Sequence, residues 1–209
     1  MEYTARKGLR FPRPALKCSA MSDPFFFGYG SLVNRATHLF EDAHPAQLTG
    51  WRRAWRHTRL RPLAFLTAVP AEGHQIDGLV AHVPNDNWVA LDEREHAYDR
   101  TPVTDLTSHS VLRPIHVQVY SIPHGKHGVP DETHPVLLSY VDVVVQGYLR
   151  EFGEDGVARF FETTDGWDAR ILDDRTQPIY SRHQSLGSDE RALVDDWLRN
   201  VEARVITRA

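Results

Sequence analysis

The chain has 209 residues, of which 41% are hydrophobic and 10% aromatic, so it can bury one well-packed core. Its net charge of −4 argues against broad electrostatic binding to nucleic acid, and no apolar run approaches the roughly 18 residues of a membrane span. The N-terminus also lacks the apolar core of a secretory signal, so we expect a cytoplasmic protein with neither nucleic acid nor a membrane as partner.

The first 20 residues form a leader that we expect to be a disordered extension. They contain Pro and Arg and lack periodic apolar positions. Cys18, the single cysteine of the chain, cannot form an internal disulfide and is discounted as a nucleophile. Met21 stands just before the first predicted strand, so residues 1–20 fit an upstream-start extension and residues 21–209 a single domain.

The first predicted strand is the apolar run at residues 25–27, which leads into a turn that contains Gly28, Gly30 and Ser31. Gly28 and Gly30 are expected to adopt positive φ and to let backbone N–H groups approach an anion. Ser31 adds a hydroxyl. The alternative is a strand followed by an ordinary turn, because short motifs often match by accident.

The next expected elements are a short helix at 34–40 and strands at 46–59, 63–69 and 76–83. Gly73 and His74 mark the predicted hairpin between the last two strands. Residues 51–61 contain five arginines and two tryptophans, a composition that also suits single-stranded nucleic acid. A strand with Trp51 and Trp55 on one face explains the same composition.

A helix is predicted from Trp88 to Tyr98, with Asn85 as its N-cap. At about 100° per residue, Trp88, Leu91, Glu95 and Tyr98 fall on one narrow stripe. Burial among apolar residues raises the pKa of a carboxyl group toward neutrality, which suits a general base. Glu95 is therefore the candidate catalytic residue, and the alternative is a buried glutamate paired with a nearby arginine.

The rest of the chain predicts one strand and three helices. The strand covers 115–120, and the helices are 136–152 ended by Gly153, 157–162, and one that begins at Ser188. The buried stripe of the last helix comprises Leu193, Val194, Trp197, Leu198, Val201 and Val205. Most predicted strands lie in the first part of the chain, and helices are inserted between them and follow them. This order indicates an α+β fold.

With these segments in place, the chain resembles the gamma-glutamylcyclotransferase family. The hallmark of that family is a Tyr-Gly-Ser-Leu or Tyr-Gly-Ser-Asn loop after the first strand and a helical glutamate downstream, here Tyr29 to Leu32 and Glu95. The resemblance covers about residues 25–160. It implies an α+β fold with a small closed β-barrel flanked by helices, and the loop and Glu95 would meet at the barrel mouth. Residues 161–209 match neither the glutathione-specific nor the general γ-glutamyl branch of the family and are expected to form a C-terminal helical extension.

The resemblance implies a cyclising acyl transfer, a transferase or lyase activity of glutathione metabolism. The α-amine of a γ-glutamyl group would attack its own γ-carbonyl and release 5-oxoproline with an amine or peptide. Glu95 would act as general acid and base, and backbone N–H groups around Gly30 and Ser31 would hold a carboxylate or oxyanion. The implied substrate-binding residues are Tyr29, Gly30, Ser31, Leu32, Tyr120 and Tyr140.

Tyr120 and Tyr140 have an alternative as ordinary core-edge tyrosines. No cofactor or metal is required, the expected partner is a small γ-glutamyl substrate, and the protein would be a monomer or homodimer. The leaving group stays open between cysteinylglycine, an amino acid, a polyamine and a lysine side-chain amine.

Two other functions are considered. The first is a catalytically silent module that binds a γ-glutamyl or pyroglutamyl ligand, because a fold alone does not guarantee activity. The second is a zinc- or nickel-binding protein. Its ligands would come from His124, His127 and His134, with Asp131 and Glu132 between them and His74 and His116 as further contributors.

Two arginines of the C-terminal part are candidates for substrate specificity. Arg175 or Arg182, brought near the barrel mouth, would pair with a carboxylate on the leaving portion of the substrate. The alternative is an internal salt bridge between an arginine and an aspartate.

Overall fold

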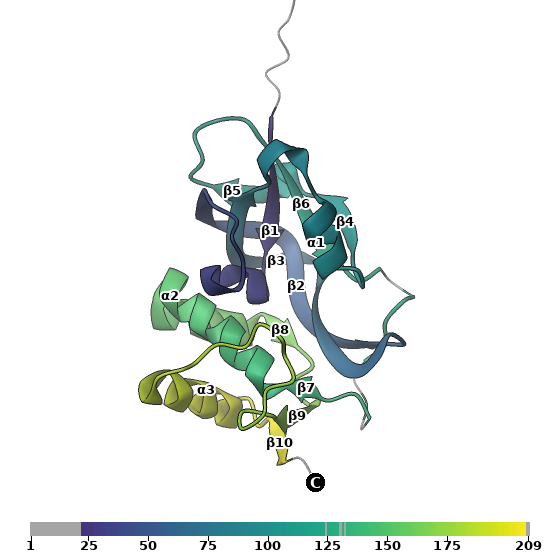
Figure 1. Cartoon of the computed structure of the whole chain (residues 1–209), viewed down its shortest axis with the longest axis vertical. Helices are drawn as coiled ribbons and strands as arrows, with labels where there is room; N and C mark the ends of the chain where they lie inside the picture. The colour runs from purple at the N-terminus through teal and green to yellow at the C-terminus, as the bar shows by residue number, and fades with distance from the viewer. Residues whose placement is uncertain (1–21, 124, 130, 132, 208–209) are drawn as a thin grey trace, which may run out of the picture.

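The computed structural model describes residues 22–123, 125–129, 131 and 133–207, so the predicted extension at residues 1–20 lies outside the described residues. The chain forms a curled β-sheet with a layer of helices and short strands packed beside it (Figure 1). The strands of the sheet are β1 (Asp23–Gly28), β2 (Ala43–Thr58), β3 (Arg61–His82), β4 (Asp99–Pro102), β5 (Thr107–His109), β6 (Ile115–Ser121) and β8 (Thr164–Asp165).

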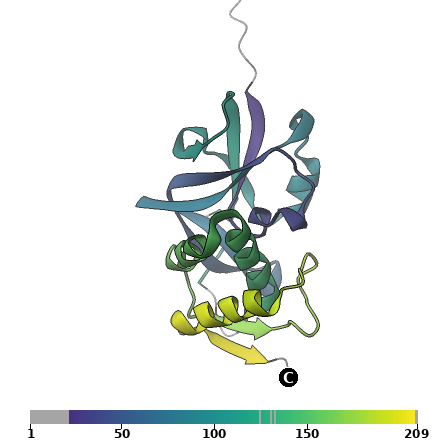
Figure 2. The same ribbon diagram turned by 90° about the vertical axis from the view of Figure 1, so that its left-hand side faces the viewer.

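The sheet has the order β4-β6-β1-β3-β2-β5, and β8 pairs with β2 outside this path. β1 is antiparallel to β3 and parallel to β6. Figures 1 and 2 show that the sheet curls strongly into a half-barrel. The predicted α+β fold with a barrel-like sheet and flanking helices is confirmed. No pairing among the described residues joins β4 to β5, so the barrel is open between these two short edge strands.

The apolar run of β1 is buried on both of its faces, because successive side chains of a strand point to opposite sides. Phe25 and Phe27 belong to the main core. Phe26 points the other way, into a smaller cluster with Trp88 and Leu91. Leu91 belongs to helix α1 (Val89–Arg94), so the second face of β1 holds α1 against the sheet.

β3 runs without interruption through Gly73 and His74, so the predicted hairpin at these residues is wrong. The chain reverses instead between β2 and β3, at residues 59–60. The pairing of the two strands shifts beside Gly50, and residues 71–74 of β3 bulge out of the ladder. Gly50 and Gly73 both have positive φ, which lets the long strands bend where the sequence resembles a turn.

The second layer contains α2 (Leu138–Glu162), α3 (Ser188–Asn200) and a small sheet. The order of that sheet is β10 (Arg204–Thr207), β9 (Arg170–Asp173) and β7 (Val136–Leu137). Gly153 interrupts the helical conformation of α2 with φ of 67°, at the predicted helix end. Val205 lies in β10 and is 45% exposed, so its predicted place on the last helix is wrong. The C-terminal part of the chain therefore adds strands as well as a helix.

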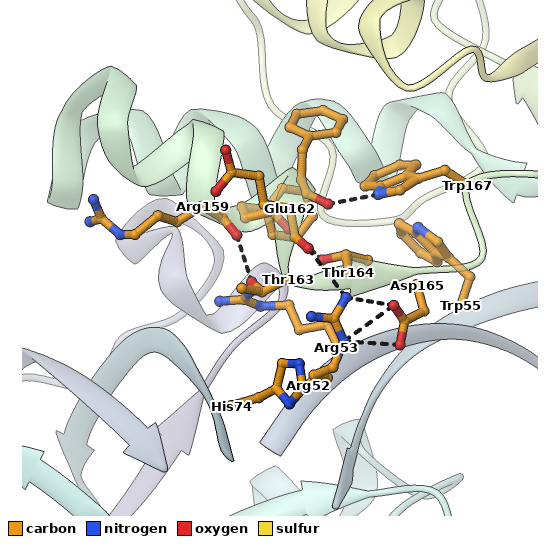
Figure 3. Close-up of polar contacts among 12 residues, drawn as sticks. Arg52, Arg53, Trp55, His74, Arg159, Glu162, Thr163, Thr164, Asp165 and Trp167 are labelled. Carbon is orange, nitrogen blue, oxygen red and sulfur yellow. Dashed lines mark hydrogen bonds and ion pairs between the residues drawn. The ribbon is translucent and has the colours of Figure 1, made fainter. Parts of the chain in front are cut away.

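Two arginines of β2 connect the sheet to the end of α2 (Figure 3). Arg52 forms an ion pair with Asp165 at 2.6 Å and donates to the carbonyl oxygen of Glu162. Arg53 is completely buried and donates to the hydroxyl of Thr163 at 2.6 Å. Both arginines therefore bind other parts of the same chain. The composition of residues 51–61 had also suited single-stranded nucleic acid.

Among the described residues, no helix is long and apolar enough to cross a bilayer.

Candidate active site

Two adjoining cavities lie where the loop after β1 meets the end of α1 and the start of α2. The inner cleft, of about 30 Å³, is lined by Phe27, Gly28, Tyr29, Gly30, Ser31, Leu32, Leu66, Glu95, Tyr98, Tyr120 and Tyr140. The outer cavity has a volume of about 350 Å³. Glu95, Ser31 and Tyr140 line both. The fold therefore brings Glu95 together with all six residues implied to bind the substrate.

The loop at Gly30 uses glycine for close packing. The expectation of positive φ at Gly28 and Gly30 is wrong: Gly28 is the last residue of β1, and Gly30 has φ of −115° and ψ of −131° at the start of a 3-10 turn. A Cβ atom on Gly30 would lie 2.6 Å from the hydroxyl oxygen of Tyr140. Glycine is needed here because the Tyr140 side chain occupies the space of any larger residue.

Tyr29 is held at both ends. Its hydroxyl donates to the carbonyl oxygen of Tyr120 at 2.6 Å. Its own carbonyl oxygen accepts hydrogen bonds from Arg53 Nε at 3.2 Å and from the Tyr148 hydroxyl at 2.9 Å. Burial raises the pKa of Tyr29, so its hydroxyl keeps its proton. The loop is therefore fixed by side chains from β2 and α2, which sequence reasoning did not assign to the site.

Glu95 stands at the C-cap of α1, and its N–H donates to the carbonyl oxygen of Leu91 at 2.8 Å. The predicted helix from Trp88 to Tyr98 is longer than the six residues observed, because the chain turns after Arg94 to enter β4. Asn85 is not the N-cap either, since it lies in a preceding 3-10 turn with φ of 57°. Glu95 thus reaches the cavities from a turn, and its side chain is 16% exposed.

Arg94 is a site residue that the sequence did not indicate. Its guanidinium lies 3.0 Å from a Glu95 carboxylate oxygen and donates to Ser31 Oγ at 3.1 Å and to the Thr37 carbonyl oxygen at 3.0 Å. The sequence predicted that Arg94 and Glu95 lie in one continuous helix. Neighbouring side chains of a helix do not face each other, so that prediction gave no sign of this contact. The ion pair matches the alternative considered for Glu95, but the carboxylate also lines both cavities.

Opposing effects act on the Glu95 carboxyl. Burial raises its pKa, while the positive charges of Arg94 and Arg182, a hydrogen bond from Arg94 and the charge of His96 lower it. The net direction is upward. A carboxyl group in this setting can both accept and return a proton near neutral pH.

Besides Tyr29, three more tyrosines line the inner cleft. Tyr98 donates to the carbonyl oxygen of Leu66 at 2.9 Å, and Tyr120 donates to Asp92 Oδ1 at 2.6 Å. Burial raises the pKa of Tyr140 well above its usual range, and the negative charge of Glu95 acts in the same direction. A hydrogen bond from the Ser31 backbone opposes this effect. The Tyr140 hydroxyl therefore lies directly at the loop and is protonated at neutral pH.

The two candidate specificity arginines have different positions. Arg182 lines the outer cavity. Arg175 lines neither cavity: its guanidinium donates twice to the Asp142 carboxylate, at 2.8 and 2.7 Å, and to Asp195 at 2.7 Å. Arg175 therefore forms the internal salt bridge that was the alternative for the two arginines. Arg182 is the candidate arginine that lies next to the site.

The histidines considered for a metal are only partly brought together. His134 and Asp131 lie 2.6 Å apart, and His57 of β2 approaches Asp131 to 3.9 Å. The side-chain ligand atoms of this trio lie within 4.8 Å of one another. His124 and Glu132 lie outside the described residues. His116 and His74 make other hydrogen bonds, to Thr104 and Gln118 and to the Glu72 carbonyl oxygen.

Comparisons with known proteins show the family and the fold of the chain. A family model described as "Gamma-glutamyl cyclotransferase, AIG2-like" matches residues 26–140, which include the loop, Glu95 and Tyr140. A solved structure described as "Gamma-glutamyl cyclotransferase" is similar with a TM-score of 0.51 and 14% identity, over 84% of this chain and 99% of that chain.

Two further structures support the same fold. An uncharacterized protein from Homo sapiens has a TM-score of 0.52 and 14% identity, over 82% of this chain and 97% of that one. YkqA from Bacillus subtilis has a TM-score of 0.52 and 17% identity, over 69% of this chain and 56% of that one. Among the curated proteins, none matches this sequence. At these identities the solved structures show the fold.

Proposed function

Because the chain belongs to the gamma-glutamyl cyclotransferase, AIG2-like family, we propose that it is an enzyme that cyclises a γ-glutamyl compound to 5-oxoproline and releases the attached amine or peptide. The observation that carries this proposal is the position of Glu95: a mostly buried carboxylate lies beside the Tyr29 loop and lines both cavities. The reaction needs one proton acceptor and donor at this place, and it needs no second substrate.

The reaction begins with the substrate's α-ammonium group, whose ordinary pKa is about 8, so that it is mostly protonated at neutral pH. Glu95 accepts one of its protons. The freed amine nitrogen then attacks the γ-carbonyl carbon of the same molecule, and the carbonyl oxygen becomes an oxyanion. When the oxyanion re-forms the carbonyl and the bond from this carbon to the leaving nitrogen breaks, Glu95 returns the first proton to that nitrogen. The freed carboxylate of Glu95 then takes the second proton from the nitrogen that is now part of the 5-oxoproline ring and passes it to the departing amine, which leaves as an ammonium. The protein regains its starting protonation state.

The loop supplies positioning and charge stabilisation. Because the inner cleft is small, the γ-glutamyl group would lie at the junction of the two cavities, beside Glu95 and Ser31. The Tyr140 hydroxyl stays protonated, so it remains a hydrogen-bond donor for the substrate carboxylate or the oxyanion, together with backbone N–H groups around Gly30 and Ser31. Holding the flexible glutamyl chain in a near-attack geometry contributes several kcal/mol to the lowering of the barrier.

Arg94 orients the general base. Its guanidinium contacts both Glu95 and Ser31, so it fixes the distance between the carboxylate and the loop. It also limits the rise in the pKa of Glu95 that burial causes. The carboxylate therefore keeps an ionised fraction that can take the proton.

The test is Glu95→Gln, assayed for 5-oxoproline release from a panel of γ-glutamyl peptides, amino acids and amines. Glutamine keeps the shape but accepts no proton, so we expect the rate to fall on the order of 100- to 10,000-fold. Glu93→Gln, an exposed position of the same helix, is the matched control and should keep its activity. Near-normal turnover by Glu95→Gln would contradict the mechanism.

The same panel separates an enzyme from a silent binding module. A module that only holds a γ-glutamyl or pyroglutamyl ligand would bind members of the panel in calorimetry without releasing 5-oxoproline. In that case Glu95→Gln would change affinity at most, and the wild-type protein would show no turnover.

A further inference from the structure

The outer cavity is built largely by parts of the chain outside the Tyr29 loop. Its lining includes Arg61 and residues 63–66 of β3, residues 94–98 from the end of α1 onward, and residues 179–182. Residues 179–182 lie beyond residues 26–140, the part that the family model matches. Since Glu95 lies at the junction with the inner cleft, whatever is attached to the leaving nitrogen extends into this cavity.

The cavity carries an excess of positive charge. Its lining includes Arg61, Arg94 and Arg182 but a single carboxylate, Glu95. Arg94 already contacts Glu95 at 3.0 Å. Across the described part of the chain, no carboxylate lies within ion-pair distance of Arg61 or Arg182. Arg35, Arg52 and Arg175, in contrast, each have a carboxylate partner.

The segment that carries Arg182 is held in place by buried contacts. Asp174 is 2% exposed and accepts hydrogen bonds from the backbone N–H groups of Ser139 and Ile179, both at 2.8 Å. The ring of Tyr180 packs edge-on against Tyr140 with centroids 5.0 Å apart. These contacts tie the segment to the start of α2 and to the site tyrosine, so Arg182 is presented to the cavity by an ordered framework.

We propose that the outer cavity binds a negatively charged leaving portion of the substrate, and that Arg182 and Arg61 recognise its carboxylate. The proposal rests on the cyclotransferase function proposed above. In a γ-glutamyl amino acid, one carbon separates the carboxylate of the leaving amino acid from the leaving nitrogen. This carboxylate therefore lies in the outer cavity when the γ-glutamyl group is bound beside Glu95. A polyamine leaving group would instead bring positive charge toward the two arginines. The preferred substrates are therefore γ-glutamyl amino acids or short peptides.

The experiment compares two substrates of equal shape, γ-glutamyl-alanine and γ-glutamyl-alaninamide, which differ in the charge of the leaving portion. The readout is kcat and KM for 5-oxoproline release, and γ-glutamyl-putrescine serves as a cationic third substrate. We expect the wild-type protein to prefer alanine over alaninamide by about ten-fold or more in kcat/KM, because charge-assisted bonds to arginine are strong. Putrescine should be the poorest substrate.

The variants are Arg182→Ala, Arg61→Ala and their double variant, with Arg204→Ala of β10 as an exposed control distant in sequence from the cavity lining. We expect Arg182→Ala to raise KM for the alanine substrate and to reduce the ratio of kcat/KM between alanine and alaninamide. The loss of its charge from the surroundings of Glu95 affects both substrates alike and cancels in this ratio. In the double variant the preference should disappear, and Arg204→Ala should keep it.

The outcomes distinguish the two proposals. Turnover of both substrates at equal efficiency by the wild-type protein, or a preference that survives in the double variant, overturns the carboxylate site but leaves the cyclotransferase function intact. If no member of the panel yields 5-oxoproline, the cyclotransferase function itself is wrong.

Discussion

Arg53 Nε donates a hydrogen bond to the carbonyl oxygen of Tyr29 at 3.2 Å, so a fully buried cation of β2 supports the loop that lines the inner cleft. Its guanidinium also bonds to the carbonyl oxygen of Asp77 and the hydroxyl of Tyr148, both at 2.5 Å. It further lies over the rings of Tyr148 and Phe160, at 4.9 and 5.3 Å from their centroids. The loop is thus held from behind by a residue that does not line either cavity.

Arg53→Met should destabilise the fold and lower activity together. The substitution removes the hydrogen bonds that Arg53 donates to the carbonyl oxygens of Tyr29 and Asp77. The Tyr148 hydroxyl has one proton for these two oxygens, so one oxygen is left unsatisfied, at about 1–3 kcal/mol. Arg52→Met at the neighbouring position removes a partly exposed ion pair with Asp165, and such pairs contribute about 0–1 kcal/mol. Chemical denaturation of both variants measures the difference. Equal stability losses at the two positions would contradict the role given to Arg53.

Gly30→Ala should lower activity because the new Cβ displaces the Tyr140 hydroxyl, which would lie 2.6 Å away. The next ring atom, Cζ of Tyr140, would lie 3.8 Å away, which is an ordinary contact. Tyr140→Phe should therefore remove most of the clash. We expect the effects of Gly30→Ala and Tyr140→Phe on kcat/KM to be clearly less than additive in the double variant. Simple additivity would show that the two residues do not interact.

The acid limb of the pH profile should report the environment of Glu95. The reaction needs the ionised carboxylate, so kcat/KM rises as pH rises through the pKa of Glu95, which lies above the usual glutamate value. Arg94 lowers this pKa by its charge. Arg94→Met should therefore move the acid limb of the kcat/KM profile to higher pH. This shift is separate from any fall in the maximal rate. A limb that stays in place or moves to lower pH would refute the assignment of this limb to Glu95.

Arg175→Ala should lower stability and leave substrate recognition alone. The substitution leaves Asp142, which is 5% exposed, without the partner that opposes the rise of its pKa by burial. We expect the free energy of unfolding to fall by about 2–3 kcal/mol. Removing one partner of a completely buried ion pair costs about 3–5 kcal/mol, and this pair is partly exposed. A thermal melt and Michaelis–Menten kinetics check the two parts, with Arg182→Ala as the variant of opposite behaviour. A large change in KM at unchanged stability would place Arg175 in recognition after all.

The sequence by itself determined the elements whose signal is local. The run of three phenylalanines predicted a buried strand followed by a loop, and Gly153 predicted the interruption of α2. The spacing of Leu91 and Glu95 placed the carboxylate on the buried side of its segment. Apolar spacing and glycine positions report local conformation and burial directly, so these features follow without knowledge of the partners.

Only the tertiary structure decided which charges meet. Arg94 contacts Glu95 because α1 ends one residue before it, and Arg53 reaches Tyr29 across 24 positions of sequence. Arg175 and Arg182 have the same chemistry and lie close together in sequence, yet one is bound to Asp142 and the other lines the outer cavity. A charge can pair with any opposite group that the fold brings near, so the partners of an arginine depend on segments distant along the chain, which no local pattern encodes.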